Sequence, residues 1–537
     1  MLSYRKLAMR VLGRPLHTEG IDSPRPASQR AAAFILTAAM LTTLAAPAFA
    51  DIWHIENGDI TISAGESGNN VTQNNNTTYG DTNTIITNQN KDTASSHTVT
   101  IEAKDKDDKV EVTLKDVNID TSSRNKAAVS VTGEGDTNIK LDGDNALKSD
   151  IYRSGIYGSG SGSLTISGGE NDSLTAQGGS GANGISSSGS LTISGGTVTA
   201  NGDDGGRGIS SNGGVTISGG STVTANGGSG TISGGDGIWS GGGVTISGGS
   251  TVTANGGNGG SLVGGDGIRS GGGLTVSDGT VTAKGGNGDS KDGYGGDGIR
   301  SGGVVTISGN TVNAAGGYGG KVGGYGICSF DRVAISGGTV EAAGGNGSTG
   351  GGSGIYSSVI DLSGSLELTA KAGSPNGKAL SQKGSELVLD TIKDKLGPGA
   401  KVTATDADGK VIDQVSTPRP VEPEESSSSS DGGSAAPSAP ASPLPGLTVT
   451  DKDGQRISYT STQSGNTLTV CVGRLTASFR ISLAALRQLR AEGIETIAFQ
   501  TVLCSTTLSV DELLAMGGEN AEAVLTHRFT DSSLTVG

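Results

Sequence analysis

Acidic side chains recur at one fixed place in an internal repeat of the chain. The sequence Gly-Gly-Asp-Gly-Ile occurs three times and contains Asp236, Asp266 and Asp297, while Asp203 and Asp204 belong to the unit before them. Carboxylates that stack at close range repel one another unless they are protonated or bridged by a cation. The spacing therefore predicts either a row of Ca²⁺ sites along one edge of the molecule or a row of solvated aspartates in turns.

An arginine follows two of these aspartates at a distance of three residues, in the pairs Asp266/Arg269 and Asp297/Arg300. A polysaccharide lyase needs carboxylates that hold Ca²⁺ beside an arginine that removes a proton, and these pairs are the nearest match in the repeats. The repeats contain no histidine. Because an aspartate and an arginine three residues apart more often form a surface ion pair, we expect a protein that is not an enzyme.

The residue that follows each Gly-Ile element forms a second series that could do chemistry. Equivalent residues of successive repeats stack about 4.8 Å apart, so this series predicts an outward column of aromatic rings and arginines that suits contact with sugars. Trp239 is one of only two tryptophans in the chain. The alternative is an unselected row that faces solvent. The candidate ligand-binding residues are Tyr157, Trp239, Arg269, Arg300 and Tyr356.

The elements that position these side chains follow from the repeat itself. Eight Gly-Ile elements recur at intervals of 24 to 31 residues, in the range of solenoid repeats. Within a unit, apolar residues two positions apart, such as Val244 and Ile246, point to one side of a short strand. The pattern predicts an all-β, right-handed parallel β-helix of three-strand coils. Its glycine-rich bends are expected to use positive φ, and loops of variable length are expected along one edge.

Changes in composition divide the chain into six expected segments. Residues 1–50 combine six basic residues with an apolar stretch and a small-x-small end, which predicts a cleaved signal peptide, with a retained membrane anchor as the alternative. A polar tract near 69–90 predicts a mobile loop. The segments are a signal peptide (1–50), irregular N-terminal coils and a cap (51–150), glycine-rich repeats (151–360), C-terminal coils or a cap (361–415), a Pro/Ser-rich linker (416–446) and a small α+β module (447–537).

Composition and charge exclude several classes of protein. Glycine accounts for 95 of 537 residues without recurring at every third position, which excludes collagen, and a hydrophobic content of 32 % argues against a layered enzyme core. Removal of residues 1–50 would change the formal charge from −15 to −19, which makes nucleic acid a poor partner. No second long apolar segment predicts a membrane span. Cys471 and Cys504 could pair, but the sequence alone does not establish a disulfide.

The order of the motifs carries a family resemblance over about residues 51–395. Trp53-x-Ile55 and Gly58-Asp59-Ile60-Thr61-Ile62 are followed by alternating strands at 110–120, then by Ser-Leu-Thr-Ile-Ser-Gly-Gly and the Gly-Ile coils. In this order the chain resembles the secreted carbohydrate-binding β-helix proteins of clostridia, whose fold is similar to pectate lyase. The resemblance implies binding of plant polysaccharides, an association with Ca²⁺ and no established catalysis. It transfers no ligand residue to a numbered position here.

These observations predict a secreted or cell-surface protein that binds a plant or bacterial polysaccharide without catalysis, with Ca²⁺ as a possible aid. The main alternative is an adhesin or structural surface protein without a defined glycan, and a polysaccharide lyase is a minor one. A third class is suggested by outward Thr-x-Thr rows in four successive units, which resemble the rows of ice-binding solenoids, although threonine is also a good strand former.

Overall fold

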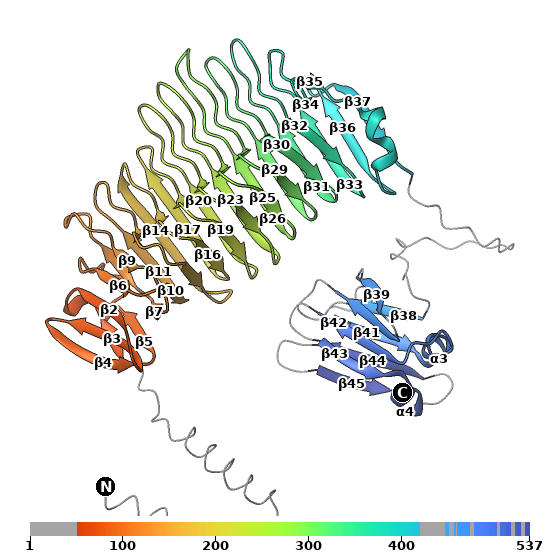
Figure 1. Cartoon of the computed structure of the whole chain (residues 1–537), viewed down its shortest axis with the longest axis horizontal. Helices are drawn as coiled ribbons and strands as arrows, with labels where there is room; N and C mark the ends of the chain where they lie inside the picture. Colours follow the sequence, from red (N-terminus) through yellow and green to blue (C-terminus); the bar gives the residue numbers. More distant parts are fainter. Residues whose placement is uncertain are drawn as a thin grey trace, which may run out of the picture. The chain divides into compact units, whose positions relative to one another are not determined.

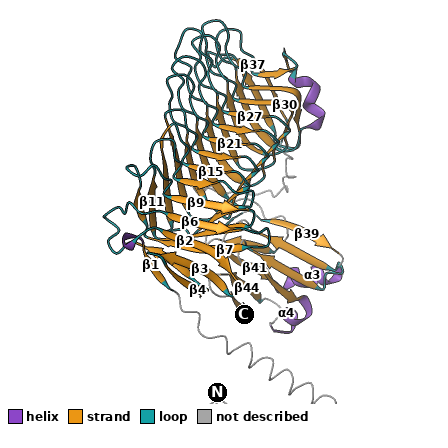
Figure 2. Cartoon of the chain, turned by 60° about the vertical axis from the view of Figure 1, so that its left-hand side comes forward, coloured by secondary structure: helices purple, strands orange, loops and turns teal. Residues whose placement is uncertain are grey.

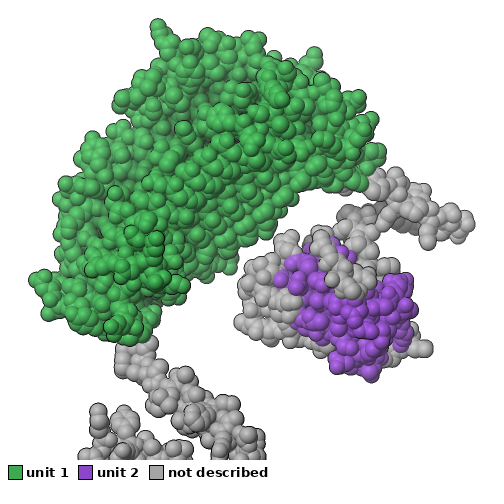
Figure 3. All heavy atoms as spheres, viewed as in Figure 1, with its two compact units in different colours: residues 1–422 green, residues 423–537 purple. Residues whose placement is uncertain are grey.

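The computed structural model of the chain contains two compact units, residues 1–422 and 423–537 (Figure 3). The structure describes residues 51–418 and 446–536, apart from 451–455, 458, 465, 473–476, 502–504, 517–520 and 528–531. The expected signal peptide and Cys504 lie outside the described residues, as does most of the expected linker. No helix among the residues that the structure describes is long and apolar enough to cross a membrane.

Unit 1 is a parallel β-helix of about 13 turns, which confirms the predicted fold class (Figure 1). In the fourth repeat the three strands of a coil are β21 (Ile238–Ser240), β22 (Val244–Ile246) and β23 (Ser250–Asn255). Each of them pairs in parallel, residue for residue, with its equivalents in the neighbouring coils. The first two strands of a coil belong to one 25-stranded sheet and the third belongs to a 12-stranded sheet.

The strands of the repeats form three such series. The first contains β12 (Ile156–Gly158), β15 (Ile185–Ser187), β18 (Ile209–Ser211), β21, β24 (Ile268–Ser270), β27 (Ile299–Ser301), β30 (Ile327–Ile335), β32 (Ile355–Leu362) and β34 (Leu380–Gln382). The second contains β13 (Leu164–Ser167), β16 (Leu191–Ser194), β19 (Val215–Ser218), β22, β25 (Leu274–Val276) and β28 (Val305–Ile307). The third contains β14 (Ser173–Ser180), β17 (Thr197–Asp203), β20 (Thr222–Asn226), β23, β26 (Gly279–Lys284), β29 (Thr311–Ala315), β31 (Gly338–Ala343), β33 (Leu366–Lys371) and β36 (Lys401–Thr405).

The alternating apolar residues form one continuous core inside the coils. Ile238, Val244, Ile246, Val252 and Ala254 are all buried, and so are their equivalents in the neighbouring coils. Each fully buried Val, Leu or Ile side chain contributes roughly 1.5–3 kcal/mol relative to an exposed one. The stacked core therefore fixes the register of every coil, and with it the register of the outward columns.

The N-terminal coils begin with β1 (Ile52–His54), η1 (Ile55–Asn57) and the antiparallel strands β2 (Ile60–Gly65), β3 (Gly68–Gln73) and β4 (Asn76–Asp81) (Figure 2). The expectation of a mobile loop near 69–90 is wrong, because the polar side chains there satisfy buried hydrogen bonds. Gln73 Nε2 donates to the carbonyls of His54 and Gly58. The remaining strands are β5 (Thr84–Thr87), β6 (Val99–Ala103), β7 (Lys109–Lys115), β8 (Asn118–Asp120), β9 (Val129–Gly133), β10 (Asp136–Asp142) and β11 (Asp144–Lys148).

The C-terminal end of the solenoid is covered by β35 (Ser385–Glu386), η2 (Leu389–Lys395) and β37 (Val411–Ser416). Strand β37 runs antiparallel to β36 and ends the 12-stranded sheet. Leu389 and Ile392 of η2 are buried against the core. Both ends of the β-helix are therefore closed by antiparallel or helical segments, as an array with open strand edges requires.

The loops of variable length form an ordered layer, which we call the flap, between the third strand of one coil and the first strand of the next. The flap segments are 227–237, 256–267, 285–298, 316–326 and 344–354. Backbone bridges join equivalent positions of successive flap segments. One series of bridges runs through Gly230, Gly259, Gly288, Gly319 and Gly347. A second series, closer to the C-terminal end of each segment, runs through Ser233, Val263, Tyr294 and Val322. Figure 1 shows the loops stacked side by side along the edge of the solenoid.

The glycines of the flap serve the close approach of neighbouring backbones and not a positive φ. Gly257 N–H donates to Gly235 O, Gly265 N–H donates to Gly257 O, and the chain of such bonds continues to Gly373, with the first two N···O distances 2.8 Å. A Cβ atom on Gly235 would lie 1.9 Å from the Gly206 carbonyl oxygen. The expectation of positive φ holds for the bend before the third strand, for example at Gly248 and Gly249, and not for these flap residues.

Unit 2 is a small α+β module, as expected from the sequence. Its two four-stranded sheets contain β38 (Leu447–Thr450), β41 (Ala477–Ser482), β44 (Glu522–His527) and β45 (Ser532–Val536) in one, and β39 (Thr460–Ser464), β40 (Thr467–Cys471), β42 (Thr496–Gln500) and β43 (Ser505–Ser509) in the other. Helices α3 (Leu483–Ala491) and α4 (Val510–Met516) follow Ser482 and Ser509, whose Oγ atoms accept the N–H groups of Ala485 and Glu512. Phe479 and Phe499 meet in its core.

Candidate functional site

The structure aligns the predicted contact column. In the first strand series, Trp239 pairs with Ser210 on one side and Arg269 on the other, and Arg269 pairs with Arg300. The column then continues from Arg300 through Cys328 to Tyr356. Because the register is fixed by backbone pairing, the two arginines lie one strand spacing apart, about 4.8 Å along the axis.

The three aspartates of the Gly-Gly-Asp-Gly-Ile motif also stack in register, directly before this strand series. The Asp266 N–H donates to Asp236 Oδ1 at 2.9 Å, and the Asp297 N–H donates to Asp266 Oδ1 at 2.7 Å. The Tyr325 N–H completes the row by donating to Asp297 Oδ1 at 2.7 Å. The side chains of Asp236, Asp266 and Asp297 are only 8, 5 and 1 % exposed. Each carboxylate is therefore buried and held by the backbone of the next coil.

Three arginines lie beside this row of carboxylates. Arg207 Nε is 3.2 Å from Asp236 Oδ2, and Arg269 Nη1 is 3.9 Å from Asp266 Oδ2. Arg300 reaches two carboxylates, with Nε 3.1 Å from Asp266 Oδ2 and Nη2 2.9 Å from Asp297 Oδ2. These distances define ion pairs, although neither Arg300 Nε nor Asp297 Oδ2 has a hydrogen-bond partner of good angle.

Burial dominates the protonation behaviour of the row. It raises the pKa of Asp266 to about 7, an effect that the Asp297 carboxylate increases and the Arg300 guanidinium opposes. Burial raises the pKa of Asp297 to about 6, again against the effect of Arg300. The pKa of the Cys328 thiol, one coil beyond, is raised by burial to about 12, so this thiol is neutral at physiological pH.

A hollow of about 660 Å³ opens above these groups, and we call it the arginine groove. The flap lines it with Ser233, Val263 and the glycines next to them, and with Asp236 and Asp266. Its charged lining residues are Arg207, Asp236, Asp266, Arg269 and Arg300. Because its walls are made of stacked coils, the groove presents similar groups at successive steps along the solenoid.

The predicted aromatic residues lie beside the groove and do not line it. The Arg207 guanidinium covers the Trp239 ring at 4.4 Å from the ring centroid. Tyr356 stacks on Tyr325, with centroids 4.9 Å apart and the planes 17° from parallel. Tyr157 is exposed but stands three coils before Trp239 in the column. The structure therefore brings Arg269 and Arg300 into the groove and leaves the three rings outside its lining.

Two groove residues escaped the sequence reasoning. Asn183 and Arg207 occupy the position of the aspartates in earlier coils, as shown by the Arg207 N–H, which donates to Asn183 Oδ1 at 2.8 Å. Counting back two residues from each Gly-Ile isoleucine would have found both. The same count shows why Asp203 and Asp204 do not belong to the row. Both are exposed, and Asp204 Oδ2 instead accepts a hydrogen bond from Ser180.

The carboxylates of the groove are already engaged by arginines and by backbone N–H groups. Among the residues that the structure describes, no three His, Cys, Asp or Glu side chains lie close enough together to hold a metal ion. Asp236, Asp266 and Asp297 therefore already have protein partners for their charge. We do not propose a metal site at any of these positions.

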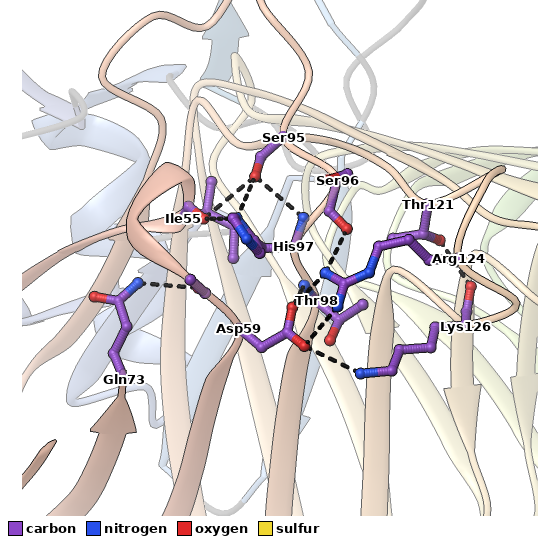
Figure 4. A network of polar contacts seen from close by, with 11 residues as sticks. Ile55, Asp59, Gln73, Ser95, Ser96, His97, Thr98, Thr121, Arg124 and Lys126 are labelled. Atoms are coloured by element: carbon purple, nitrogen blue, oxygen red, sulfur yellow. Dashed lines mark hydrogen bonds and ion pairs between the residues drawn. The ribbon is translucent and has the colours of Figure 1, made fainter. Parts of the chain in front are cut away.

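A second polar cluster lies in the N-terminal coils and was not predicted (Figure 4). Arg124 donates two hydrogen bonds to the Asp59 carboxylate, and Lys126 donates a third. Burial opposes the charge on Asp59, but bonds from the Thr98 N–H and from both cations lower its pKa to about 2. Although the cluster also contains a serine and a histidine, Ser95 Oγ and His97 Nδ1 both contact the Ile55 carbonyl. Ser95 Oγ also lies 3.4 Å from His97 Nδ1, and the cluster ties neighbouring coils together.

Comparisons with protein-family models, curated proteins and solved structures found no match to the chain. The functional argument that follows therefore rests on the geometry of the arginine groove.

Proposed function

We propose that the chain is a secreted, non-catalytic polysaccharide-binding protein that holds an extended glycan along the arginine groove. The observation that carries this proposal is that Arg269 and Arg300 stand in register in successive coils, while Arg207 lines the same groove from the row of the aspartates. A polymer with a regular repeat can contact equivalent groups in successive coils, and several weak contacts to one chain sum to a useful affinity. Arginine donors suit the hydroxyl and carboxylate oxygens that polysaccharides present.

The same geometry argues against lyase chemistry at the Asp-x-x-Arg pairs. A proton-abstracting arginine would have to lose its own proton. Burial disfavours the charged form of Arg300, but the Asp297 and Asp266 carboxylates outweigh it and raise the pKa of this side chain above its ordinary value. We therefore assign these pairs to binding and to the architecture of the groove.

The test compares two arginines that differ in location but match in exposure. Arg269 in the groove is 51 % exposed and 3.9 Å from its aspartate, while Arg332, outside the groove, is 50 % exposed and 4.0 Å from Asp361. With the full secreted chain, retention on insoluble cellulose, pectate gel and bacterial cell wall identifies a ligand. Arg269→Ala should then weaken binding by about tenfold or more, equivalent to about 1.4 kcal/mol, and Arg332→Ala should not.

The absorbance of unsaturated sugars, which a polysaccharide lyase would produce, is followed in the same samples. Equal affinity of both variants would move the site away from the groove. A rise in absorbance with wild type would replace the binding function by a lyase. No retention on any of the three materials would favour the adhesive or structural alternative.

A further inference from the structure

The arginine groove holds charges of opposite sign at two depths. The carboxylates of Asp236 and Asp266 line it and, like that of the neighbouring Asp297, are almost fully buried. The guanidinium groups are more accessible, since the Arg269 side chain is half exposed and Arg300 about one-third exposed. A ligand in the groove therefore meets the arginines first. The aspartates affect its binding by compensating the positive charge of these arginines.

Arginine is concentrated in this groove. Between Ile156 and Phe330 the sequence contains three arginines, and all three line the groove. The lysines of the same repeats, Lys284, Lys291 and Lys321, are not among its lining residues. In an acidic protein, the groove is thus a site where an anionic group would find cations, provided that the buried carboxylates do not compensate their charge.

The groups that face the buried carboxylates come from every element around them. Asp266 is flanked by Asp236 and Asp297 in its own row and by Arg269 and Arg300 of β24 and β27. On the far side lie Tyr325 and Cys328, whose pKa values are raised by burial, so both stay neutral. No histidine lines the groove. The raised pKa values of Asp266 and Asp297 therefore make these two carboxyl groups the ones that change charge here between mildly acidic and alkaline solution.

We propose that the groove binds anionic groups of a glycan more tightly in mildly acidic than in alkaline solution, because protonation of Asp266 and Asp297 leaves Arg269 and Arg300 uncompensated. This regulation rests on the proposed function. The stacked architecture makes it work, because the carboxylates are almost fully buried while the arginines remain within reach of a ligand. A charge that is lost from a low-dielectric site changes the local field more than one lost at the surface.

The experiment measures affinity by titration calorimetry at pH 5.5 and pH 8.5, with the full secreted chain. Trigalacturonate is the anionic probe, since its carboxylates stay ionised at both values, and cellotriose is the neutral probe. Wild type should bind trigalacturonate about tenfold more tightly at pH 5.5 than at pH 8.5. Cellotriose affinity should change little with pH.

Asp266→Asn is the informative variant, because an amide oxygen can still accept the Asp297 N–H while the charge is gone. This variant should bind trigalacturonate at pH 8.5 more tightly than wild type does, with a pH effect reduced by at least about threefold. Asp361→Asn removes a carboxylate that pairs with Arg332 and Lys395 away from the groove, and should keep the wild-type profile. Circular dichroism at both pH values checks that each variant is folded.

The outcomes separate this proposal from the proposed function. If both sugars bind without pH dependence, or Asp266→Asn keeps the full wild-type effect, the regulation is refuted and the binding function stands. If neither sugar binds, the binding function fails at this groove. Sodium sulfate then serves as an anionic probe without a sugar, followed by the NMR signals of the arginine Nε–H groups. A sulfate affinity equal at both pH values would overturn the pH dependence as well.

Discussion

The close approach of glycine backbones in the flap predicts that one methyl group has opposite effects at two neighbouring positions. A Cβ on Gly352 would lie 1.8 Å from the Gly324 carbonyl oxygen, whereas a Cβ on Gly350 would meet only the methyl groups of Val322 at 3.8 Å. Neither residue has positive φ. We therefore expect Gly352→Ala to destabilise unit 1 strongly and Gly350→Ala to leave it unchanged or slightly more stable.

The magnitude follows from what must move to admit the methyl group. The Gly324 oxygen accepts the Gly345 N–H at 2.8 Å, and the Gly352 N–H donates to Gly345 O at the same distance. Overpacking costs about 1–3 kcal/mol, and loss of one buried backbone hydrogen bond adds about 1–3 kcal/mol. Gly352→Ala should thus lower the free energy of unfolding by about 2–6 kcal/mol. At Gly350, the lower entropy of the unfolded chain stabilises by about 0.4–1 kcal/mol.

Urea unfolding of the full chain, followed by tryptophan fluorescence, measures the change, and hydrogen exchange shows whether it is confined to the neighbouring coils. A third variant separates close approach from backbone conformation. Gly249 has φ of +72° and open space around its Cβ position, so Gly249→Ala should cost only about 1–2 kcal/mol. If Gly352→Ala costs no more than Gly249→Ala, the close-approach argument is wrong.

Three further predictions concern other parts of the chain. Because the folded-state pKa of Asp266 is raised to about 7, its stabilising effect is complete below its ordinary value of 3.8 and is lost as pH rises through about 7; the free energy of unfolding of wild type, measured in urea, should therefore fall by about 2 kcal/mol between pH 5.5 and pH 8.5, from the roughly 1.5 pKa units between 5.5 and 7 at 1.36 kcal/mol each, and that of Asp266→Asn should fall much less. The lowered pKa of Asp59 acts in the other direction: the stabilising effect of this carboxylate is present above pH 3.8 and is lost as pH falls through about 2. Hydrogen exchange of the N-terminal coils should therefore become faster in acid, and Asp59→Asn should remove this acid sensitivity. Ser482 caps α3 by accepting the Ala485 N–H, and Ser482→Ala should lower the stability of unit 2 by about 1 kcal/mol while the unfolding of unit 1 is unchanged.

The coil geometry was predictable because it depends on residues two apart in sequence. The alternation of Val244 and Ile246 fixes which side chains point inward, and the interval between Gly-Ile elements fixes which residues stack. The contact column from Trp239 to Arg300 followed from these two rules. The flap was less predictable, because its hydrogen bonds join glycines of different coils, and glycine carries no side-chain pattern that would show which residues meet.

The same limit explains what was missed at the site. The sequence placed Asp236, Asp266 and Asp297 in turns, where aspartate is usually solvated. Their burial depends on the flap, and their partners depend on the register between coils, so Arg207 was found only in the structure. A row of exposed carboxylates would have favoured cations. Burial instead favours protonation of Asp266 and Asp297, against the effect of the paired arginine.

The high glycine content and the chemistry of the groove are therefore connected. Each flap segment lies against its neighbours at backbone contact distance, as the 1.9 Å between a Gly235 Cβ and the Gly206 oxygen shows. Only residues without side chains approach so closely, and the aspartates near the end of these segments are buried within the packed layer. Removal of water raises the pKa of Asp266 into the physiological range. A substitution such as Gly235→Ala should for this reason do more than destabilise a loop: by opening the flap it should return the pKa of the carboxylates toward 4, which carbon-13 NMR of the aspartate side chains would detect. An unchanged pKa in a variant with a demonstrably opened flap would show that the neighbouring charges, and not burial, set the protonation of the groove.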